Sequence, residues 1–460
     1  MKSIGMLRAW ILCLRYPKLN SAQREALRTR RLRALVKVAR ARSPLYAQLY
    51  RDVAEDFTLG DLPPVRKLEL MEHWDDWVTD RAAKLADVQT FMQNLDNVGR
   101  KFRGRYLVFT TSGSTGNPLV MLCDSTTNAV MGAVNIARGI ANPQVLRALI
   151  RRGSKTMGVF ATGGFYLSNG SVRARQLQMP WKKNQMRVIS ALLPLPEIVQ
   201  ALNAFQPAML GGYPSPLELL VEEQRSGRLS IHPLLIMTGG EFLSDVTRAS
   251  LAQAFGCPVQ TSYSCTEGGT LACECREQHF HINEDWVTLE PVDAQNRPVP
   301  DGLQADKLLL TNLFNYTQPF IRYELTDRVT LHREPCACGN PSPWLTLEGR
   351  TDDVLTFTQD GRSIRVAPLP LYATLKEAHA LRRFQLVAHP GNRLLLRLEA
   401  AQGFSPEDAF AQASARLLAY LHTQGVTEVS LAMDVQPPRQ HPVSGKFKHI
   451  LNGASETEPS

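Results

Sequence analysis

Short apolar runs alternate with longer helical patterns through the middle of the chain. The runs hold four to six residues, end at turn-forming residues, and predict buried strands at 106–109, 156–160, 186–190, 208–213 and 234–238. Apolar residues at helical spacing predict helices over 195–205 and 216–226. Strands and helices that alternate in this way predict a mostly parallel sheet with right-handed crossovers and helices on both faces.

The pattern changes near Asp353. Short alternating strands at 355–357 and 394–398, with one helix over 406–424, are typical of a small α+β domain. At 460 residues and 44% apolar composition, the chain exceeds what a single core usually supports. We therefore expect an α/β protein with a large N-terminal domain (1–351), whose mostly parallel sheets are flanked by helices. A small mobile α+β lid domain (352–460) follows, with a disordered polar tail at 452–460.

The positive charge of the chain is local. The net charge is +9, but residues 1–50 hold twelve Lys or Arg against one acid, Glu25, so the remainder is close to neutral. A nucleic-acid binder would spread basic residues over a reading surface. The distribution therefore argues against a nucleic-acid partner.

The basic N-terminal segment, about 1–60, is predicted to be helical. Its apolar run at 9–14, between Arg8 and Arg15, is too short to span a bilayer and has no signal-peptide features, so we expect no transmembrane segment and a cytoplasmic protein. Over 22–41, apolar residues recur at helical spacing beneath an arginine-rich face. This helix is either a membrane-surface helix or, as we favour, a helix laid on the main domain with its arginines in solvent.

A hydroxyl- and glycine-rich segment follows the first predicted strand. Glycines let a backbone approach an anion closely, and the hydroxyls and amides supply neutral donors to a polyphosphate. The spacing is not that of a Walker A motif, and an ordinary Ser/Gly/Thr turn is the alternative for this segment alone. The candidate phosphate-binding residues are Thr111, Ser112, Gly113, Ser114, Thr115 and Gly116.

Three further polar segments follow predicted strands or precede one. They are 238–241, 262–269, which follows a short predicted strand at 259–261, and 322–327; each combines glycines or hydroxyls with a carboxylate. Ligands of open α/β sheets bind at the carboxyl ends of strands. A nucleoside triphosphate with Mg²⁺ needs a carboxylate for the metal, hydroxyls for the phosphates, a carboxylate for the ribose and an aromatic ring for the base.

Four of the eight cysteines form two tight pairs, at 273/275 and 336/338. A reducing compartment makes thiol ligands a better interpretation than disulfides. With His279 and His281 between the pairs, thiolates and an imidazole from two hairpins could hold one tetrahedral Zn²⁺. The alternative is a set of reduced core and loop cysteines.

Together these motifs resemble those of adenylate-forming enzymes, and within that superfamily most closely those of phenylacetate-CoA ligases. The resemblance covers most of the chain, in order. The matching segments are the phosphate loop at 111–118, Gly239-Gly240-Glu241, Tyr263 to Glu267, Tyr323 to Asp327, the Gly349 to Asp353 hinge and Gly445-Lys446. The cysteine pattern is also similar, and it implies Cys275, His281, Cys336 and Cys338 as the metal ligands.

The resemblance implies a role for each matching residue. The loop hydroxyls would hold the β- and γ-phosphates, and the turn with Gly240 and Glu241 would belong to the nucleotide site. Glu267 would bind Mg²⁺, and Thr266 the α-phosphate. Tyr263 would stack on adenine, while Asp327, helped by Arg350, would bind the ribose. Lys446 is the catalytic candidate, because a mobile ammonium can stabilise the charge that builds when a carboxylate attacks the α-phosphate; on its own it would be an ordinary surface lysine.

The chain departs from the family pattern in four places. Asn117 replaces the lysine of the phosphate loop, Ser264 replaces a glycine, and Glu324 to Thr326 replace Arg-Thr-Gly beside Asp327. After the hinge, the glycine-containing segment that covers the thiol acceptor is replaced by 358–365. Adenylation is therefore predicted more firmly than transfer to coenzyme A.

Three functions remain open. The first is a carboxylate-CoA ligase that uses ATP and Mg²⁺, rotates its C-terminal domain about Asp352 and passes the acyl group to CoA. The second transfers the acyl group to an amine, and the third is a zinc-stabilised nucleotide-binding module without catalysis. Glycine-bearing turns at 160–166, 211–214 and 238–240 could line a flat slot for an aromatic acid, or only pack aromatic side chains. A homodimer is left open.

Overall fold

The computed structural model describes residues 4–111, 118–140, 142–350, 355–366, 368–440 and 447–452. The chain divides into two compact units. The larger is built mainly from Met1–Leu325 with Thr330–Thr346, and the smaller mainly from Leu347–Pro442. The predicted hinge at Asp352 and most of the predicted disordered tail lie outside the described residues.

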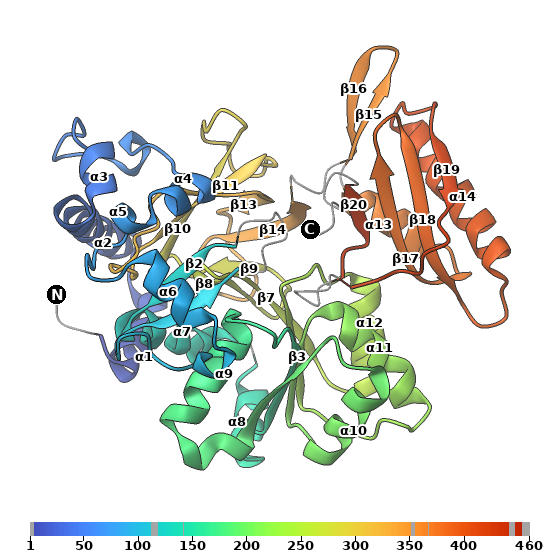
Figure 1. Cartoon of the computed structure of the whole chain (residues 1–460), viewed down its shortest axis with the longest axis horizontal. Helices are drawn as coiled ribbons and strands as arrows, with labels where there is room; N and C mark the ends of the chain where they lie inside the picture. The colour runs from blue at the N-terminus through green and yellow to red at the C-terminus, as the bar shows by residue number, and fades with distance from the viewer. Residues whose placement is uncertain are drawn as a thin grey trace. The chain divides into compact units, whose positions relative to one another are not determined.

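A nine-stranded sheet forms the centre of the larger unit, with helices packed against it (Figure 1). Its strand order is β13-β14-β9-β8-β7-β6-β5-β3-β4. The strands are β3 (Thr156–Phe160), β4 (Met186–Ser190), β5 (Met209–Gly212), β6 (Leu235–Gly239), β7 (Val259–Cys265), β8 (Gly269–Glu274), β9 (Phe280–Ile282), β13 (Asp327–His332) and β14 (Trp344–Arg350).

One half of this sheet is parallel, as predicted, and most of the rest is antiparallel. The pairs β4–β3, β3–β5, β5–β6 and β6–β7 are parallel. The pairs β7–β8, β8–β9 and β9–β14 are antiparallel. Short turns join β7 to β8 and β8 to β9, and connections that short allow only antiparallel pairing. Strand β7 therefore belongs to both halves.

Helices cover both faces of the parallel half. The helices of the larger unit after Cys123 are α7 (Ser125–Arg138), α8 (Pro143–Arg151), α9 (Leu167–Gln178), α10 (Leu195–Phe205), α11 (Pro214–Arg225) and α12 (Asp245–Phe255). On one face, α10, α11 and α12 pack their apolar side chains around Ile236 of β6. On the other face, Leu149 of α8 packs against Leu235, the preceding residue of the same strand. Alternate strand residues thus fill two cores, as the continuous apolar run predicted.

The N-terminal segment is helical, as predicted. Its helices are α1 (Met6–Arg15), α2 (Ser21–Arg42) and α3 (Pro44–Leu49). Three further short helices follow it: α4 (Lys67–Glu72), α5 (Trp74–Trp77) and α6 (Leu85–Met92). Helix α2 buries Leu35 and Val36 against the main domain, which fits the favoured interpretation. Its arginines are not all in solvent, however, because Arg28 pairs with Glu284 and Arg31 stacks on the Trp286 ring at 3.6 Å.

Two smaller sheets complete the larger unit. The antiparallel hairpin β1 (Leu107–Thr110) and β2 (Val120–Cys123) flanks the hydroxyl-rich segment. Strands β10 (Val287–Val292), β11 (Lys307–Asn312) and β12 (Tyr323–Leu325) form a three-stranded antiparallel sheet. Within the described ranges, no helix combines the length and the apolar composition needed to cross a bilayer.

The smaller unit is an α+β domain, as the sequence predicted. Its elements are β15 (Leu355–Gln359), β16 (Arg362–Val366), α13 (Pro368–Lys376), β17 (Leu381–His389), β18 (Arg393–Ala400), α14 (Pro406–Thr423), β19 (Ser430–Met433) and β20 (Ile450–Asn452). Four of the strands form the sheet β19-β18-β17-β20, and Leu417 and Leu421 of α14 join its core.

Candidate functional site

Glu267 lies in the turn that joins the parallel and antiparallel halves of the large sheet. Strand β7 ends at Cys265, Thr266 to Gly268 form the turn, and β8 begins at Gly269. Gly269 has φ +65°, and a Cβ at Gly268 would lie 2.4 Å from a methyl carbon of Leu271. A three-residue hairpin with a left-handed residue after it requires this glycine pair.

The carboxylate of Glu267 is buried and faces one hydroxyl group. Glu267 is 5% exposed, and the Tyr323 hydroxyl donates to its Oε1 at 2.9 Å. Asn312 holds the turn in place, because its side-chain amide donates to the Glu267 carbonyl at 2.8 Å. Among the described residues, no Lys or Arg forms an ion pair with Glu267. A buried carboxylate without a counter-charge is unfavourable unless a cation binds it.

Tyr323 and Asn312 were not predicted to act on Glu267. Tyr323 begins the predicted segment that ends at Asp327, and its aromatic ring with a hydroxyl group was the only signal in the sequence. Residues 267 and 323 are far apart in sequence, and β11 relates them, because it pairs with β12 and ends at Asn312, which contacts the Glu267 turn. Asp327 itself is the first residue of β13 and is half-buried. Glu324, which replaces the family's arginine, is paired with Lys307 at 2.7 Å.

Thr111 stands at the base of the predicted phosphate loop. Its backbone N–H donates to the Leu119 carbonyl at 3.1 Å, and its Oγ1 accepts from the Leu119 N–H at 2.9 Å. The described residues on either side belong to antiparallel strands, and a strand, β2, follows where a Walker A motif would be followed by a helix. Ser112, Gly113, Ser114, Thr115 and Gly116 lie outside the described residues, as do Asn117, Lys446 and the side chain of Arg350.

Three other residues predicted for the nucleotide site lie in a strand or in the loop after one: Tyr263, Gly240 and Glu241. Tyr263 is part of β7, 7% exposed, so the strand is longer than the predicted run at 259–261. Gly240 has φ +79° in the turn after β6. The Glu241 carboxylate accepts hydrogen bonds from the N–H (3.0 Å) and hydroxyl (3.1 Å) of Ser215. Helix α11 has no side-chain cap from Tyr213, its own N-cap residue, so Glu241 supplies that cap from another loop.

An aromatic pair lies where two neighbouring parallel strands end. Phe160 ends β3 and Tyr213 follows β5, and their rings meet edge to face at a centroid distance of 5.1 Å. Gly158 leaves room for the Phe160 ring, because a Cβ there would lie 2.8 Å from its Cδ2. A separate hollow of about 450 Å³ on α10 and the end of α11, lined by Leu195, Val199 and Arg228 among others, includes none of the predicted site residues.

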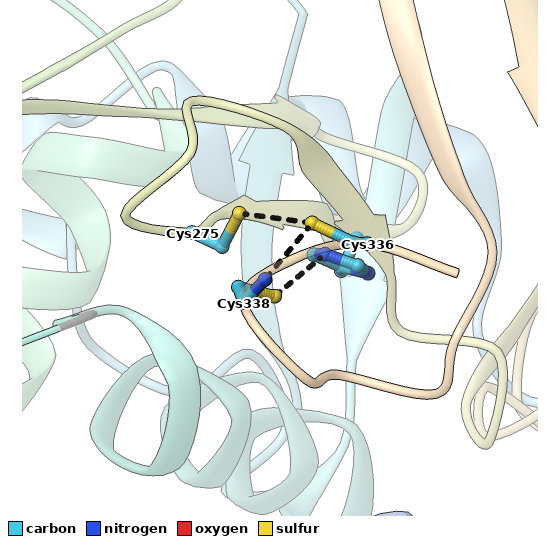
Figure 2. Close-up of side chains that lie close together, drawn as sticks. Cys275, Cys336 and Cys338 are labelled. Atoms are coloured by element: carbon cyan, nitrogen blue, oxygen red, sulfur yellow. Dashed lines mark hydrogen bonds between the residues drawn. The ribbon is translucent and has the colours of Figure 1, made fainter. Parts of the chain in front are cut away.

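The predicted thiol and imidazole ligands meet in one cluster (Figure 2). Cys275 follows β8 and His281 lies on β9, while Cys336 and Cys338 lie between β13 and β14. The two hairpins adjoin because β9 pairs with β14. One ligand atom from each of the four residues lies within 4.8 Å of every other. The sulfurs of Cys275 and Cys336 are 3.9 Å apart, and Cys338 Sγ lies 3.2 Å from His281 Nε2.

Hydrogen bonds around the cluster orient these ligand atoms. The Ser342 carbonyl accepts from Nδ1 of His281 at 2.8 Å, so Nε2 presents its lone pair to the thiols. The backbone N–H groups of Cys338 and Asn340 point at the sulfurs of Cys336 and Cys338, at 3.5 and 3.3 Å. Burial lowers the pKa of His281 and raises that of Cys338 to about 12. A cation could bind the neutral imidazole directly, and it would displace the protons of the crowded thiols, which would then bind it as thiolates.

Cys273 and His279 do not complete the cluster. Cys273 is buried beside Asn283, whose Nδ2 lies 3.7 Å from its sulfur, and burial raises its pKa to about 11. His279 lies with Nδ1 3.3 Å from Cys336 Sγ, but its ring stacks on Trp344 at 3.7 Å. All eight cysteines are free thiols.

The segment that departs from the expected acceptor-covering pattern forms a tight hairpin. Asp360 and Gly361 both have positive φ, at 49° and 73°, and join β15 to β16 by a two-residue turn. The Asn392 amide donates to the Thr358 carbonyl at 2.6 Å and accepts from its N–H at 2.9 Å. These hydrogen bonds therefore fix the hairpin near its turn, where Thr358 pairs with Ser363.

Comparison with known proteins identifies the fold. No protein-family model matches the chain. Protein CapK of Staphylococcus aureus is 26% identical over 250 residues, which are 53% of this chain and 52% of that relative, about half of its length. The crystal structure of 2-hydroxyisobutyryl-CoA ligase with 2-HIB-AMP matches with a TM-score of 0.70 at 19% identity, over 94% of this chain and 90% of that one.

A second solved structure extends the comparison. The anthranilate CoA ligase AuaEII with anthranoyl-AMP matches with a TM-score of 0.51 at 15% identity, over 74% of this chain and 65% of that one. At these identities the likeness concerns the fold alone. The chain has the α/β fold of these CoA ligases, with a separate C-terminal domain, as the resemblance to adenylate-forming enzymes implied.

Proposed function

We propose that this chain activates an organic carboxylic acid with ATP and transfers the acyl group to the thiol of coenzyme A. In the first step a carboxylate oxygen attacks the α-phosphorus and pyrophosphate leaves. In the second, the thiolate attacks the acyl carbonyl and AMP leaves. The observation that carries the proposal is the buried carboxylate of Glu267, which faces the Tyr323 hydroxyl and has no counter-charge among the described residues.

The donor set at Glu267 fits Mg²⁺. A buried carboxylate oxygen and a neighbouring hydroxyl are hard oxygen groups, and Mg²⁺ is usually held by one or two carboxylates together with substrate phosphates. When bound, the ion would neutralise charge on the phosphates. Glu267 would hold it, Tyr323 would orient the carboxylate, and Asn312 would fix the turn.

The remaining roles follow the resemblance. Thr111 and the hydroxyl-rich loop after it would hold the β- and γ-phosphates, and Thr266 the α-phosphate. Asp327 and Arg350 would bind the ribose, Tyr263 the base, and Lys446 would stabilise the charge on the transferred group. The Phe160–Tyr213 pair at the strand ends supports an aromatic acid as the substrate.

We further propose a structural Zn²⁺ at Cys275, His281, Cys336 and Cys338. Three thiols and one imidazole nitrogen within 4.8 Å suit a closed tetrahedral site. Bound zinc would join the β8–β9 hairpin to the loop between β13 and β14. The N–H groups directed at two of the sulfurs would share the thiolate charge.

Pyrophosphate exchange into ATP tests the first half-reaction. We expect exchange that depends on Mg²⁺ and on one class of acid, in a panel of aryl, arylacetic, short hydroxy and fatty acids. Adding CoA to the best acid should then give the thioester, and adding amines without CoA tests amide formation. A chain that binds ATP but exchanges with no acid would contradict the proposal and favour a non-catalytic nucleotide-binding module.

A further inference from the structure

Helix α1 presents a row of large apolar side chains to solvent. Leu7 is 68% exposed, Trp10 36%, Ile11 42% and Leu14 44%. Their spacing of three and four residues places all four on one face of the helix. An isolated exposed leucine is ordinary, but four adjacent large apolar groups on one short helix indicate a surface that is covered by something.

The opposite face of α1 is fixed to the larger unit. Ala9 and Cys13 are buried, and α1 lies along α7 (Figure 1). The side chain of Met6 fills the space over Gly132, where a Cβ would lie 2.5 Å from the methionine methyl. Arg138 of α7 donates to the Cys13 carbonyl at 3.0 Å. These contacts hold the helix in one rotational position, so the apolar row cannot turn inward.

Positive charge borders the apolar row. Arg8 and Arg15 are exposed and lie beside Ile11 on one flank of the helix, about 60° and 40° from it around the helix axis. Lys18, which is also exposed, follows in the next turn. No Asp or Glu occurs before Glu25. A short helix with Leu, Ile and Trp on one face and arginines beside it has the composition of helices that lie in the plane of a membrane interface.

We propose that α1 docks this chain on an anionic lipid bilayer. Leu7, Ile11 and Leu14 would enter the boundary between headgroups and acyl chains, Trp10 would lie at headgroup level, and Arg8, Arg15 and Lys18 would pair with lipid phosphates. A helix of ten residues lies on the bilayer and does not cross it. A second copy of the chain is disfavoured as the occupant, because pairing two such faces would bring their arginines together without any acid.

Binding to vesicles tests the proposal with the full chain. We expect flotation with vesicles of phosphatidylcholine containing about one-third phosphatidylglycerol, and much weaker flotation with phosphatidylcholine alone. Raising the salt concentration should reduce binding severalfold, because the headgroup contacts are screened. The fluorescence of Trp10, obtained as the difference between the parent chain and Trp10→Phe, should shift to shorter wavelength when anionic vesicles are added.

A matched pair of variants separates the α1 face from general surface hydrophobicity. The triple variant Leu7→Gln/Ile11→Gln/Leu14→Gln should bind anionic vesicles at least about tenfold more weakly, since it removes most of the insertable apolar area. The control, Ile150→Gln/Leu177→Gln/Leu303→Gln, replaces three exposed apolar residues elsewhere (63%, 42% and 57% exposed) and should bind like the parent. Arg8→Gln/Arg15→Gln should lose the preference for anionic lipid.

Two results would overturn the proposal. One is equal flotation of the α1 triple variant and its control, provided that both melt like the parent chain. The other is an absence of vesicle binding together with a concentration-dependent dimer, measured by light scattering, that the triple variant dissolves; α1 would then be an interface between copies. Pyrophosphate exchange without lipid should be the same in all these variants, so the test does not depend on the proposed reaction.

Discussion

The two halves of the nine-stranded sheet carry different kinds of polar side chain. At the carboxyl ends of the parallel strands, polar groups stand in separate loops, such as Glu241 after β6. In the antiparallel half, cysteine and histidine side chains converge across two adjoining hairpins, and one ligand atom from each lies within 4.8 Å of the others. Glu267 occupies the turn after β7, the strand that both halves share.

The difference follows from how each type of strand is connected. Parallel strands need crossover connections, so their carboxyl ends leave independent loops along one edge of the sheet, where a ligand can bind. Antiparallel strands joined by tight turns fix side chains in register, which suits a rigid cluster. We therefore expect substitutions on the nucleotide side to change rates more than stability, and substitutions in the cluster to do the reverse.

The largest effect is expected for Lys446→Ala. If the ammonium stabilises charge that develops only in the transition state, adenylation should fall about a hundredfold or more, with ATP affinity and melting temperature close to those of the parent. Pyrophosphate exchange, ATP titration and thermal melting measure the three quantities. Lys448→Ala is the matched control and should keep its activity; full exchange by Lys446→Ala would remove this residue from the mechanism.

The second-largest effect on adenylation is expected for Glu267→Gln. The amide keeps the size of the side chain but loses the charge proposed to hold Mg²⁺, so exchange should fall by at least about tenfold and recover partly at high Mg²⁺. Tyr323→Phe, which removes the hydroxyl that donates to Oε1 at 2.9 Å, should have a smaller effect in the same direction. An unchanged Mg²⁺ dependence in Glu267→Gln would make the carboxylate a structural group.

Local pattern was enough to predict the parallel half. The strands at 156–160 and 186–190 and the helix at 195–205 have the predicted bounds. Each is an apolar run of suitable length that ends at turn or proline residues, so its limits depend on nearby residues alone. The strand after 259 was predicted too short, because Ser262 and Ser264 read as loop residues although they alternate with Tyr263 and Cys265.

Contacts between distant residues were not predictable in the same way. The contact between Tyr323 and Glu267, the cap that Glu241 provides for α11, and the pairing of Arg28 with Glu284 each join elements that no local pattern relates. The cysteine cluster was the exception. Its spacing indicated that two pairs would meet, and the resemblance to a family implied which histidine joins them.

Removing thiols should separate stability from chemistry. Protein purified without chelators should contain about one zinc ion per chain, and Cys336→Ser/Cys338→Ser should lose it and melt at a lower temperature. Exchange activity per folded molecule should be largely kept, since the cluster is proposed to support the sheet and not to touch ATP. Cys265→Ser, which changes a cysteine outside the cluster, is the control.

Metal analysis decides between the alternatives at the cluster. Chain without bound metal would refute the zinc site. Zinc that persists in the double variant would point instead to Cys273 or His279, which lies 3.3 Å from Cys336. If the double variant melts like the parent but loses exchange, the cluster affects the reaction rate and not the stability, which contradicts the expected difference between the two halves.

The smallest effect is expected at Glu241, where the two halves of the comparison can be tested in one residue. Its carboxylate caps α11 through the N–H and hydroxyl of Ser215, so Glu241→Ala should cost about 1 kcal/mol of stability, a typical value for a lost helix cap. Ser215→Ala keeps the N–H contact and should cost less. If Glu241 also belongs to the nucleotide site, as the resemblance implies, Glu241→Ala should raise the KM for ATP while Ser215→Ala leaves it unchanged. Equal KM values in both variants and the parent would make Glu241 a cap only, because a side chain that contacts the nucleotide cannot be removed without a change in ATP affinity. Denaturant unfolding and exchange kinetics on the same three proteins measure both effects.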